Sequence, residues 1–412
     1  MRTFEEKKRL YAKLIIKFWL NLQSWQNLIL NTPIEAHDFV KLITEEAYAA
    51  WAKNIFYRRK SDELSAIRYK NAPEEVFWTY PERIAQWYTK EVKNNCAVLS
   101  LYMNDSALFK SVNPEHIKKD SKTNSLMFKE YKNFLVENRT NRCIVSIPTK
   151  WWANTIYNSK NNEENVMKLR EQIFKLVRIN EEDPIKAREN HIKNLNSYSK
   201  YLNEKKFKKL HYRSKKTDLT IELPKNHQRL SAWDKTKTWI HFCPNMPTEE
   251  VFSMPHKYWV NGKVYSTFPL EHDWKLIKNF WFTFKDWEVV DFEAEEWYEI
   301  LKSILESDKN SKRLWEVAIV PTNSPIYESW LIYYNTLFDE NASCHLALWT
   351  SYSTTLIWSE KMTPEERDKA WMNQSIIHVD FMVWDESLTI TWETYEGEKI
   401  EFFVNWKWNI NN

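Results

Sequence analysis

An apolar run near the carboxyl end of the 412-residue chain contains two ionisable side chains. Residues 374–384 read QSIIHVDFMVW, and His378 and Asp380 are two positions apart within it. Alternate side chains of a β-strand lie on the same face, so both groups would enter the same space. An imidazole and a carboxylate placed in this way can ligate a divalent metal ion. A hydrogen-bonded pair at the end of a sheet is the simpler interpretation, so a metal site requires further ligands.

More carboxylates and a second histidine lie near predicted strand ends in the last third of the chain. Glu316 is inside the apolar strand LWEVAIV, where an unpaired carboxylate would be unfavourable. Glu340 comes just before a strand that contains His345, and Glu249 and Glu250 lie in the proline-flanked loop CPNMPTEEVFSMPH. This supply of groups suits two divalent cations that share a carboxylate. Helix capping, ion pairing or a satisfied buried histidine are the structural alternatives for these residues.

The elements that must position these groups fall into two parts. In the first half, helical patterns alternate with short apolar strands such as QNLILN, NIFYRR, CAVLSLYM and RCIVSIPT. This alternation predicts an α/β N-terminal domain with a mainly parallel sheet, at residues 1–190. Strands from Asp218 onward, WLIYYN and KVYSTF among them, are closer together and turn-linked. They predict an α+β C-terminal domain rich in antiparallel strands, at residues 191–412, which also contains the candidate ligands. A long charged helical region from Glu163 to Lys216 spans the boundary between the two domains.

The composition is that of a soluble globular protein. Charged residues make up 28% of the chain and hydrophobic residues 43%, and the net charge of +3 is too mild to indicate nucleic acid or an anionic membrane as a partner. No stretch approaches a membrane span, and the N-terminus suits an amphipathic helix better than a signal peptide. The four cysteines are far apart without CxxC spacing, which fits reduced thiols in a cytoplasmic protein.

A lysine-rich segment at residues 186–216 leaves a nucleic-acid-binding protein as an alternative. Its lysines have aromatic residues between them, an arrangement that can bind nucleic acid. Acidic residues also lie among the lysines, however, and the overall charge is near balance. The solvated face of an interdomain helix is therefore the favoured interpretation, and no nucleic-acid partner is expected.

The glycine and tryptophan contents are anomalous. The chain has 23 tryptophans and only two glycines, Gly262 and Gly397, whereas average usage predicts roughly 29 glycines. Asp286-Trp287 and Asn405-Trp406 lie where tight hairpins have Asp-Gly and Asn-Gly, and YWVNGKVY contains the intact Asn-Gly form at 261–262. Trp51 and Trp371 directly follow helical patterns, at the position where a helix usually ends in glycine.

Such positions favour φ > 0, which glycine enters freely and a bulky aromatic residue does not. We therefore hypothesise that most of the tryptophans are glycines in the native protein. The genome would read UGA as glycine, and the printed sequence would be a translation with UGA as tryptophan. The 2 glycines and 23 tryptophans sum to 25, close to the roughly 29 expected. The alternative is a genuinely tryptophan-rich chain with unusual turns.

Read with glycine for tryptophan, several motifs closely resemble the thermophilic metalloprotease family of aminopeptidases. NMPTEEVFSMPH, VNGKVYSTFPL, LWEVAIVP, YYNTLFDENASCHLALW and IIHVDFMVW occur in the order of the family. In the first half, VSIPTKWWANTIY is also similar, with Trp152 a genuine tryptophan and Trp408 a second candidate. The resemblance covers nearly the whole chain.

The resemblance implies two divalent metal ions, zinc or cobalt, in each subunit of a homodimer that acts on peptides with a free N-terminus. The ligands that it implies are Glu250, Glu316, Glu340, His345, His378 and Asp380. Glu316 is implied to bridge the metals, and Tyr352 matches a tyrosine implicated in catalysis. Trp315, Trp349 and Trp384 depart from the family and, as indoles, would crowd the site.

The expected function is a metalloaminopeptidase, which hydrolyses the N-terminal residue from peptides through a water activated by two metals. The Tyr352 hydroxyl is a candidate to stabilise the tetrahedral oxyanion, with a tyrosine packed under a loop as the alternative. The alternative is that the chain is an inactive homologue that acts as a binding protein. This would hold if the tryptophans are real and block the metals.

Overall fold

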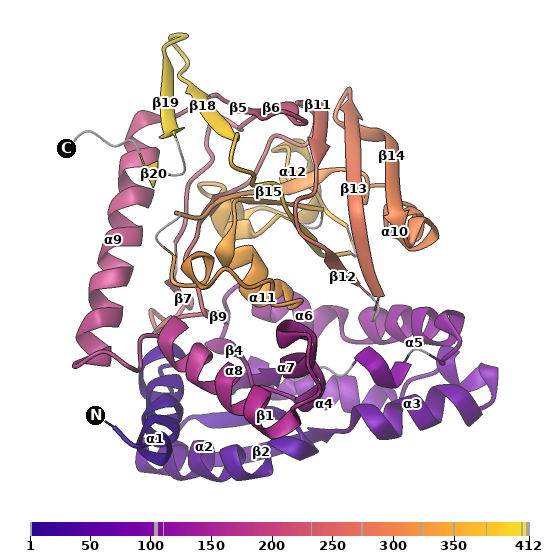
Figure 1. Cartoon of the computed structure of the whole chain (residues 1–412), viewed down its shortest axis with the longest axis vertical. Coiled ribbons are helices and arrows are strands. Elements are labelled where there is room, and N and C mark those ends of the chain that lie inside the picture. Colours follow the sequence, from indigo (N-terminus) through magenta and orange to yellow (C-terminus); the bar gives the residue numbers. More distant parts are fainter. Residues whose placement is uncertain are drawn as a thin grey trace. The chain divides into compact units, whose positions relative to one another are not determined.

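The computed structural model of the chain contains two compact units (Figure 1). It describes residues 2–102, 106–109, 111–231, 233–272, 275–321, 324–348, 351–375, 377–404 and 407–408, with the side chains of 106–107, 360 and 402–408 excepted. Trp349 and the Asn405-Trp406 pair of the sequence analysis lie outside these residues. The first unit comprises residues 1–191 and 233–247, and the second comprises 192–232 and 248–412.

The first unit is built on a five-stranded parallel sheet with strand order β2-β1-β3-β4-β9. These strands are β1 (Asn27–Pro33), β2 (Asn54–Lys60), β3 (Ala97–Tyr102), β4 (Arg142–Ser146) and β9 (Asn245–Met246), and a small pair joins β7 (Asp234–Lys235) to β8 (His241–Phe242). The helices of this unit are α1 (Phe4–Leu14), α2 (His37–Ala49), α3 (Asp62–Asn71), α4 (Glu82–Lys93), α5 (Pro114–Met127), α6 (Lys129–Val136), α7 (Lys150–Tyr157) and α8 (Asn162–Leu176). The predicted α/β layer with a parallel sheet is confirmed.

Local sequence signals explain where these elements begin and why they are buried. Thr3 caps α1 in a capping box with Glu6, and Asn113 caps α5, whose first residue is Pro114. The central strand β1 buries the consecutive residues Leu28, Ile29 and Leu30. Continuous burial of this kind is typical of a parallel strand with helices over both faces.

The second unit is rich in antiparallel strands, as predicted. Its larger sheet contains β5 (Lys209–Arg213), β6 (Asp218–Glu222), β11 (Val260–Tyr265), β12 (Leu270–His272), β13 (Lys275–Lys285), β14 (Glu288–Glu296), β18 (Thr389–Glu393), β19 (Lys399–Val404) and β20 (Lys407–Trp408). Strands β13 and β14 form a long hairpin, with α10 (Tyr298–Leu305) beside it (Figure 1). Helix α9 (Pro184–Lys205) belongs partly to each unit.

A smaller, four-stranded antiparallel sheet in the second unit positions the candidate site. Its strand order is β10-β15-β16-β17, with β10 at Val251–Ser253, β15 at Leu314–Ile319, β16 at His345–Leu348 and β17 at Val379–Met382. Every residue of β15, β16 and β17 is buried. The short helices α11 (Thr336–Asp339) and α12 (Pro364–Lys369) lie in the connections between these strands.

Three local predictions are wrong. The charged helical region ends at Lys205, because LHYR of that region forms β5 and pairs with both β6 and β18. WLIYYN forms no strand. Gly262 lies inside β11 rather than in a hairpin turn, with φ of 119°, and a Cβ atom there would lie 2.1 Å from the backbone oxygen of Asp218. The glycine is required by this close approach of two strands.

Candidate metal centre

One face of the four-stranded sheet gathers three of the predicted ligands around a small residue. Glu316 of β15 and Asp380 of β17 both pair with Ala347 of the strand between them, β16. Directly paired residues of antiparallel strands lie on the same face, and His345, two positions before Ala347, shares that face. The side chains of Glu316, His345 and Asp380 therefore converge, and the methyl group of Ala347 leaves room between the two carboxyl groups.

Two connecting segments add carboxyl groups to this face. Glu250 directly precedes β10, and its Oε2 atom lies 3.1 Å from His345 Nε2. One ligand atom from each of Glu250, Glu316 and His345 can be chosen so that all three lie within 4.8 Å of one another, a spacing suited to a shared metal ion. Glu340 lies in the segment between α11 and β16 and is buried. The four carboxyl groups thus come from elements far apart in the sequence.

His378 and Asp380, the pair that first indicated a metal site, contact each other. His378 Nε2 lies 2.7 Å from Asp380 Oδ2, and His378 is half exposed whereas Asp380 is buried. His345 is held differently, because its Nδ1 atom lies 3.0 Å from the backbone oxygen of Ser343. That contact fixes the imidazole ring with Nε2 toward the carboxyl groups, an arrangement typical of metal-ligating histidines.

Electrostatics link all six predicted ligands into one cluster. Burial, and then the neighbouring carboxyl groups of Glu250, Asp380 and Glu340, raise the pKa of Glu316 well above its usual value. Burial, followed by Asp380, Glu250 and the adjacent Asp339, likewise raises the pKa of Glu340. Carboxyl groups crowded in this way repel one another when ionised, and divalent cations would offset that repulsion.

Contacts between the histidines and the carboxyl groups favour the charged forms of both. Burial alone would lower the pKa of His345, but Glu250 and then Asp380 outweigh burial and raise it. Burial alone would raise the pKa of Asp380, but the His378 and His345 imidazoles outweigh burial and lower it. Oxygen and imidazole nitrogen donors that lie close to one another, most of them buried, fit the chemistry of zinc and of similar divalent ions.

Tyr352 and Trp315 lie at the edge of this cluster. The Trp315 ring is perpendicular to that of His378, with ring centroids 5.7 Å apart, and it also lies edge-to-face with the Tyr352 ring, with centroids 5.1 Å apart. Trp315 is the residue at which the pairing of β15 with β16 shifts register, immediately before Glu316. Trp384 packs instead against Tyr327 at 5.0 Å and is not among the described residues with positive φ. The backbone at position 384 therefore does not itself favour glycine.

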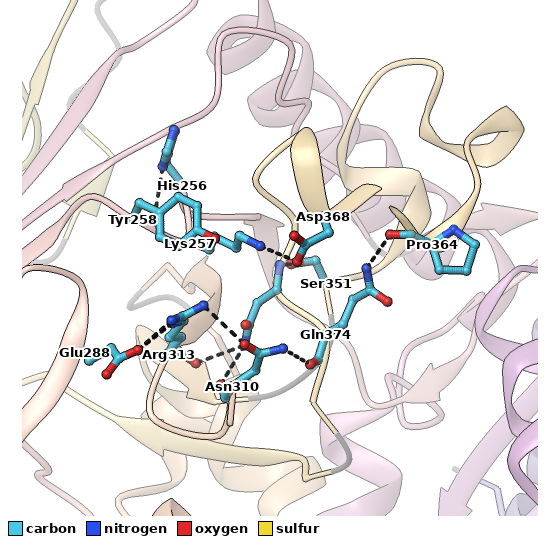
Figure 2. A network of polar contacts seen from close by, with 11 residues as sticks. His256, Lys257, Tyr258, Glu288, Asn310, Arg313, Ser351, Pro364, Asp368 and Gln374 are labelled. Carbon is cyan, nitrogen blue, oxygen red and sulfur yellow. Dashed lines mark hydrogen bonds and ion pairs between the residues drawn. The ribbon is translucent and has the colours of Figure 1, made fainter. Parts of the chain in front are cut away.

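A polar network holds the segments that lead into the site (Figure 2). Arg313, directly before β15, donates to Glu288 and to the Asn310 side chain, and Asn310 donates in turn to the backbone oxygen of Gln374 at 2.6 Å. The backbone N–H of Ser351 donates to the Asn373 backbone oxygen, and the backbone N–H of Asn373 donates to the Ser351 hydroxyl oxygen. These contacts fix the start of the Glu316 strand relative to the segments before Tyr352 and His378.

Sequence reasoning missed two residues that shape the site. The buried Asn341 side chain accepts from the Glu249 backbone N–H at 2.6 Å and donates to Glu340 at 3.4 Å. It therefore joins the Glu250 loop to the Glu340 segment. Ala347 is the other, and its small size gave no chemical signal. Glu249, the neighbour of Glu250 in this loop, is also buried.

A cavity in the first unit is not this metal centre. It has a volume of about 510 Å³ and is lined in part by Pro33 and Ser146, at the carboxyl ends of β1 and β4. Phe39, Phe174 and Arg170 are also in its lining, which contains neither histidine nor cysteine. The group of histidine and carboxyl ligand atoms that lie close enough to share a metal ion, found among the described residues, is Glu250, Glu316 and His345 of the second unit.

Comparison with known proteins assigns the family. The model of the thermophilic metalloprotease family (M29) matches residues 4–408. The chain belongs to this family. Its relatives include aminopeptidase 2 of Geobacillus stearothermophilus, 38% identical over 99% of both chains, and aminopeptidase T of Thermus aquaticus, 32% identical over the whole of both chains. The solved structure of wild-type AmpT from Thermus thermophilus matches with a TM-score of 0.92 and 31% identity, over 99% of this chain and all of that one.

Membership of the thermophilic metalloprotease family confirms three predictions. The resemblance stated from the motifs is correct, the predicted fold class is that of the family, and the chain is a metalloaminopeptidase, a hydrolase that uses divalent metal. Among the described residues, none of the helices combines the length and apolar character needed to cross a membrane.

Proposed function

We propose that the chain removes the N-terminal residue from peptides at a centre of two divalent metal ions held by Glu250, Glu316, Glu340, His345, His378 and Asp380. The observation that carries the proposal is the convergence of Glu250, Glu316 and His345 in one buried cluster. The aminopeptidase names of the relatives support a substrate with a free N-terminus.

Glu316 is the proposed bridging ligand. It is flanked by Glu250 on the side of β10 and by Asp380 on the side of β17, and both raise its pKa. A carboxylate has two oxygens and can contact one metal with each. Glu250 and His345 would complete one metal site, and Glu340, Asp380 and His378 the other. Zinc and cobalt both accept this mixture of oxygen and nitrogen donors.

The chemistry supplied by bound divalent ions is Lewis acidity and a lowered pKa for water. The protein residues would orient the reactants around the ions. Tyr352, beside the Trp315 indole that also contacts His378, would donate its hydroxyl proton in a hydrogen bond to the carbonyl oxygen of the first peptide bond as negative charge develops there. The His345 ring would be held by the Ser343 carbonyl throughout the reaction.

The setting of this activity follows from the same reasoning. The four buried, free cysteines support a reducing compartment such as the cytoplasm. The family resemblance supports a homodimer, which light scattering on the purified protein would test. A dimer mass is expected, and a monomer at micromolar concentration would contradict it.

Glu316→Gln and His345→Ala test the function. Each should abolish release of N-terminal residues from a peptide with a free N-terminus, while circular dichroism shows the fold retained. The acetylated peptide should be resistant in the unsubstituted protein. Glu396→Gln, an exposed carboxylate, is the matched control and should remain active. Retained activity in both site variants would contradict the proposal.

A further inference from the structure

Tryptophan occupies an unusual share of the left-handed backbone positions. Seventeen non-glycine residues have positive φ among the described residues, and eight of them are tryptophans. They are Trp25, Trp51, Trp239, Trp287, Trp297, Trp330, Trp358 and Trp371, with φ between 57° and 73°. Side chains with a Cβ atom are disfavoured in this region, and bulky ones most of all.

Aromatic character does not explain why tryptophan is so frequent at positions with positive φ. The chain contains 21 phenylalanines and 20 tyrosines, yet Tyr334 is the one residue of either type with positive φ in the described part of the chain. Asn and Asp account for six more of the seventeen, as expected of the residues that tolerate this conformation. Tryptophan therefore behaves here as glycine does, and unlike the other aromatic residues.

Helix ends show the same substitution in hydrogen-bond detail. After α2, the N–H of Trp51 donates to Tyr48 O and that of Ala52 to Ala47 O. This pair of bonds is the Schellman motif, with residue 51 at the position that glycine usually occupies. After α12, Trp371 donates to Asp368 O and Met372 to Arg367 O, which repeats the motif.

A tight hairpin gives independent support. Asp286 and Trp287 form the two-residue loop between β13 and β14, and their φ values are 49° and 73°. Positive φ at both positions defines a type I′ turn, for which Asp-Gly is a preferred sequence.

The indoles at these positions contribute little burial. Trp330 is 79% exposed, Trp51 and Trp239 are each 72% exposed, and Trp25 is 71% exposed. A genuine tryptophan usually buries most of its large apolar surface. Trp239 is contacted by Lys235 and Trp330 by Tyr327, but with so much of each indole exposed, packing offers little compensation for the unfavourable backbone conformation at these four sites.

We infer that all eight positions are glycine in the protein that its source organism makes, because UGA is read there as glycine. Trp152 is different. It is buried inside helix α7 without positive φ, and its backbone N–H is bonded to the side chain of Thr149. Its backbone gives no reason for glycine, and the motif VSIPTKWWANTIY also indicates a tryptophan there, so we expect it to be genuine and encoded by UGG.

The inference extends to position 315, where it rests on the proposed function. The Trp315 indole is buried against His378 and Tyr352, where ligands and substrate would have to meet. Glycine at this position would open space beside His378 and Tyr352. Position 315 would thus decide whether the first residue of a peptide can enter.

The coding DNA and the mass of peptides from the source organism test the inference. UGA is expected at the eight positions and at 315, and UGG at 152, with peptide masses that match glycine and tryptophan respectively. UGG at the eight positions, or peptide masses that match tryptophan there, would overturn the inference. Neither readout depends on enzyme activity, so a failure of the proposed function remains distinguishable.

A recombinant pair tests position 315 directly. Trp315→Gly in the printed chain should raise peptide hydrolysis at least tenfold, whereas Trp315→Phe, which keeps an aromatic ring, should not. Equal and measurable hydrolysis by the Trp315→Gly, Trp315→Phe and printed chains, each with full metal content, would overturn a role for this position in admitting substrate.

Discussion

Glu316 and Asp380 lie two strands apart and pair with the same residue, Ala347, on one face of the four-stranded sheet. Adjacent strands are about 4.8 Å apart, so the two Cα atoms are separated by roughly 10 Å across a single methyl group. Two carboxyl groups that reach toward each other over this gap enclose a space suited to metal ions. The spacing depends on the strand between them as much as on the ligands themselves.

The size of residue 347 should therefore control metal binding. Ala347→Leu would fill the gap between the carboxyl groups, and we expect loss of bound metal together with about 1–3 kcal/mol of destabilisation from overpacking. Ala347→Gly, which is smaller, should keep its metal and serves as the control. Elemental analysis of both variants checks this. Full metal content in the folded leucine variant would contradict the proposed geometry.

Asn341 should act as a positioning residue. Asn341→Ala removes the acceptor for the Glu249 N–H and the donor to Glu340, which loosens two ligand segments at once. Loss of such a supporting hydrogen bond typically weakens metal affinity by about 10–100-fold. Metal titration followed by calorimetry would measure the change, with the exposed Asn226→Ala as the matched control. Unchanged affinity in Asn341→Ala would show that the segments hold themselves in place.

The ligands of the candidate site could be predicted from the sequence, whereas the residues that space and position them could not. Strand alternation placed His378 and Asp380 together, and the family motifs supplied the other four candidate ligands. Ala347 was not predictable, because its role depends on which strand lies between two others. Asn341 was missed for a similar reason, since its partner Glu249 is 92 positions away.

The turn positions were more accessible to sequence reasoning than the strand register. Asp286-Trp287, Trp51 and Trp371 were predicted from the residues around them, and all have positive φ. Gly262 was misassigned to a hairpin turn because Asn-Gly is a local signal, whereas its real constraint is the close backbone of Asp218 in a neighbouring strand. Local chemistry reveals turns, but close packing between distant strands leaves no local signature.

Glycine should stabilise the protein at an exposed left-handed position. Trp51→Gly removes the steric conflict at φ of 64° while little packing is lost. We expect the free energy of unfolding to rise by about 1 kcal/mol. Trp51→Ala retains the Cβ atom and should give a smaller gain. Urea denaturation of both variants measures the difference, and a gain from alanine equal to that from glycine would show that backbone strain is not the cause.

Acid should destabilise the fold partly through His227. Burial, aided by the charge of Arg229, lowers the pKa of His227 to about 4 from 6.5. The unfolded chain therefore binds a proton that the folded chain does not between these pH values, and stability falls as pH decreases from 6.5 toward 4. From pH 6.5 to 5 this amounts to about 2 kcal/mol.

His227→Asn removes this titration. The difference in unfolding free energy between pH 7 and pH 5 should shrink by about 2 kcal/mol relative to the unsubstituted chain. His241→Asn, at an exposed histidine, is the control. An unchanged pH dependence in His227→Asn would show that His227 does not contribute to acid sensitivity.

The metal content of the purified protein decides whether the six residues form a two-metal centre. Elemental analysis of the printed chain and of its Trp315→Gly variant, after incubation with zinc or cobalt and removal of free metal, should give two ions per chain in at least the glycine variant. Glu316→Gln in the same background should lose both ions, because it removes the proposed bridge. No bound metal in either chain, or two ions retained by Glu316→Gln, would contradict a two-metal centre built on these six residues.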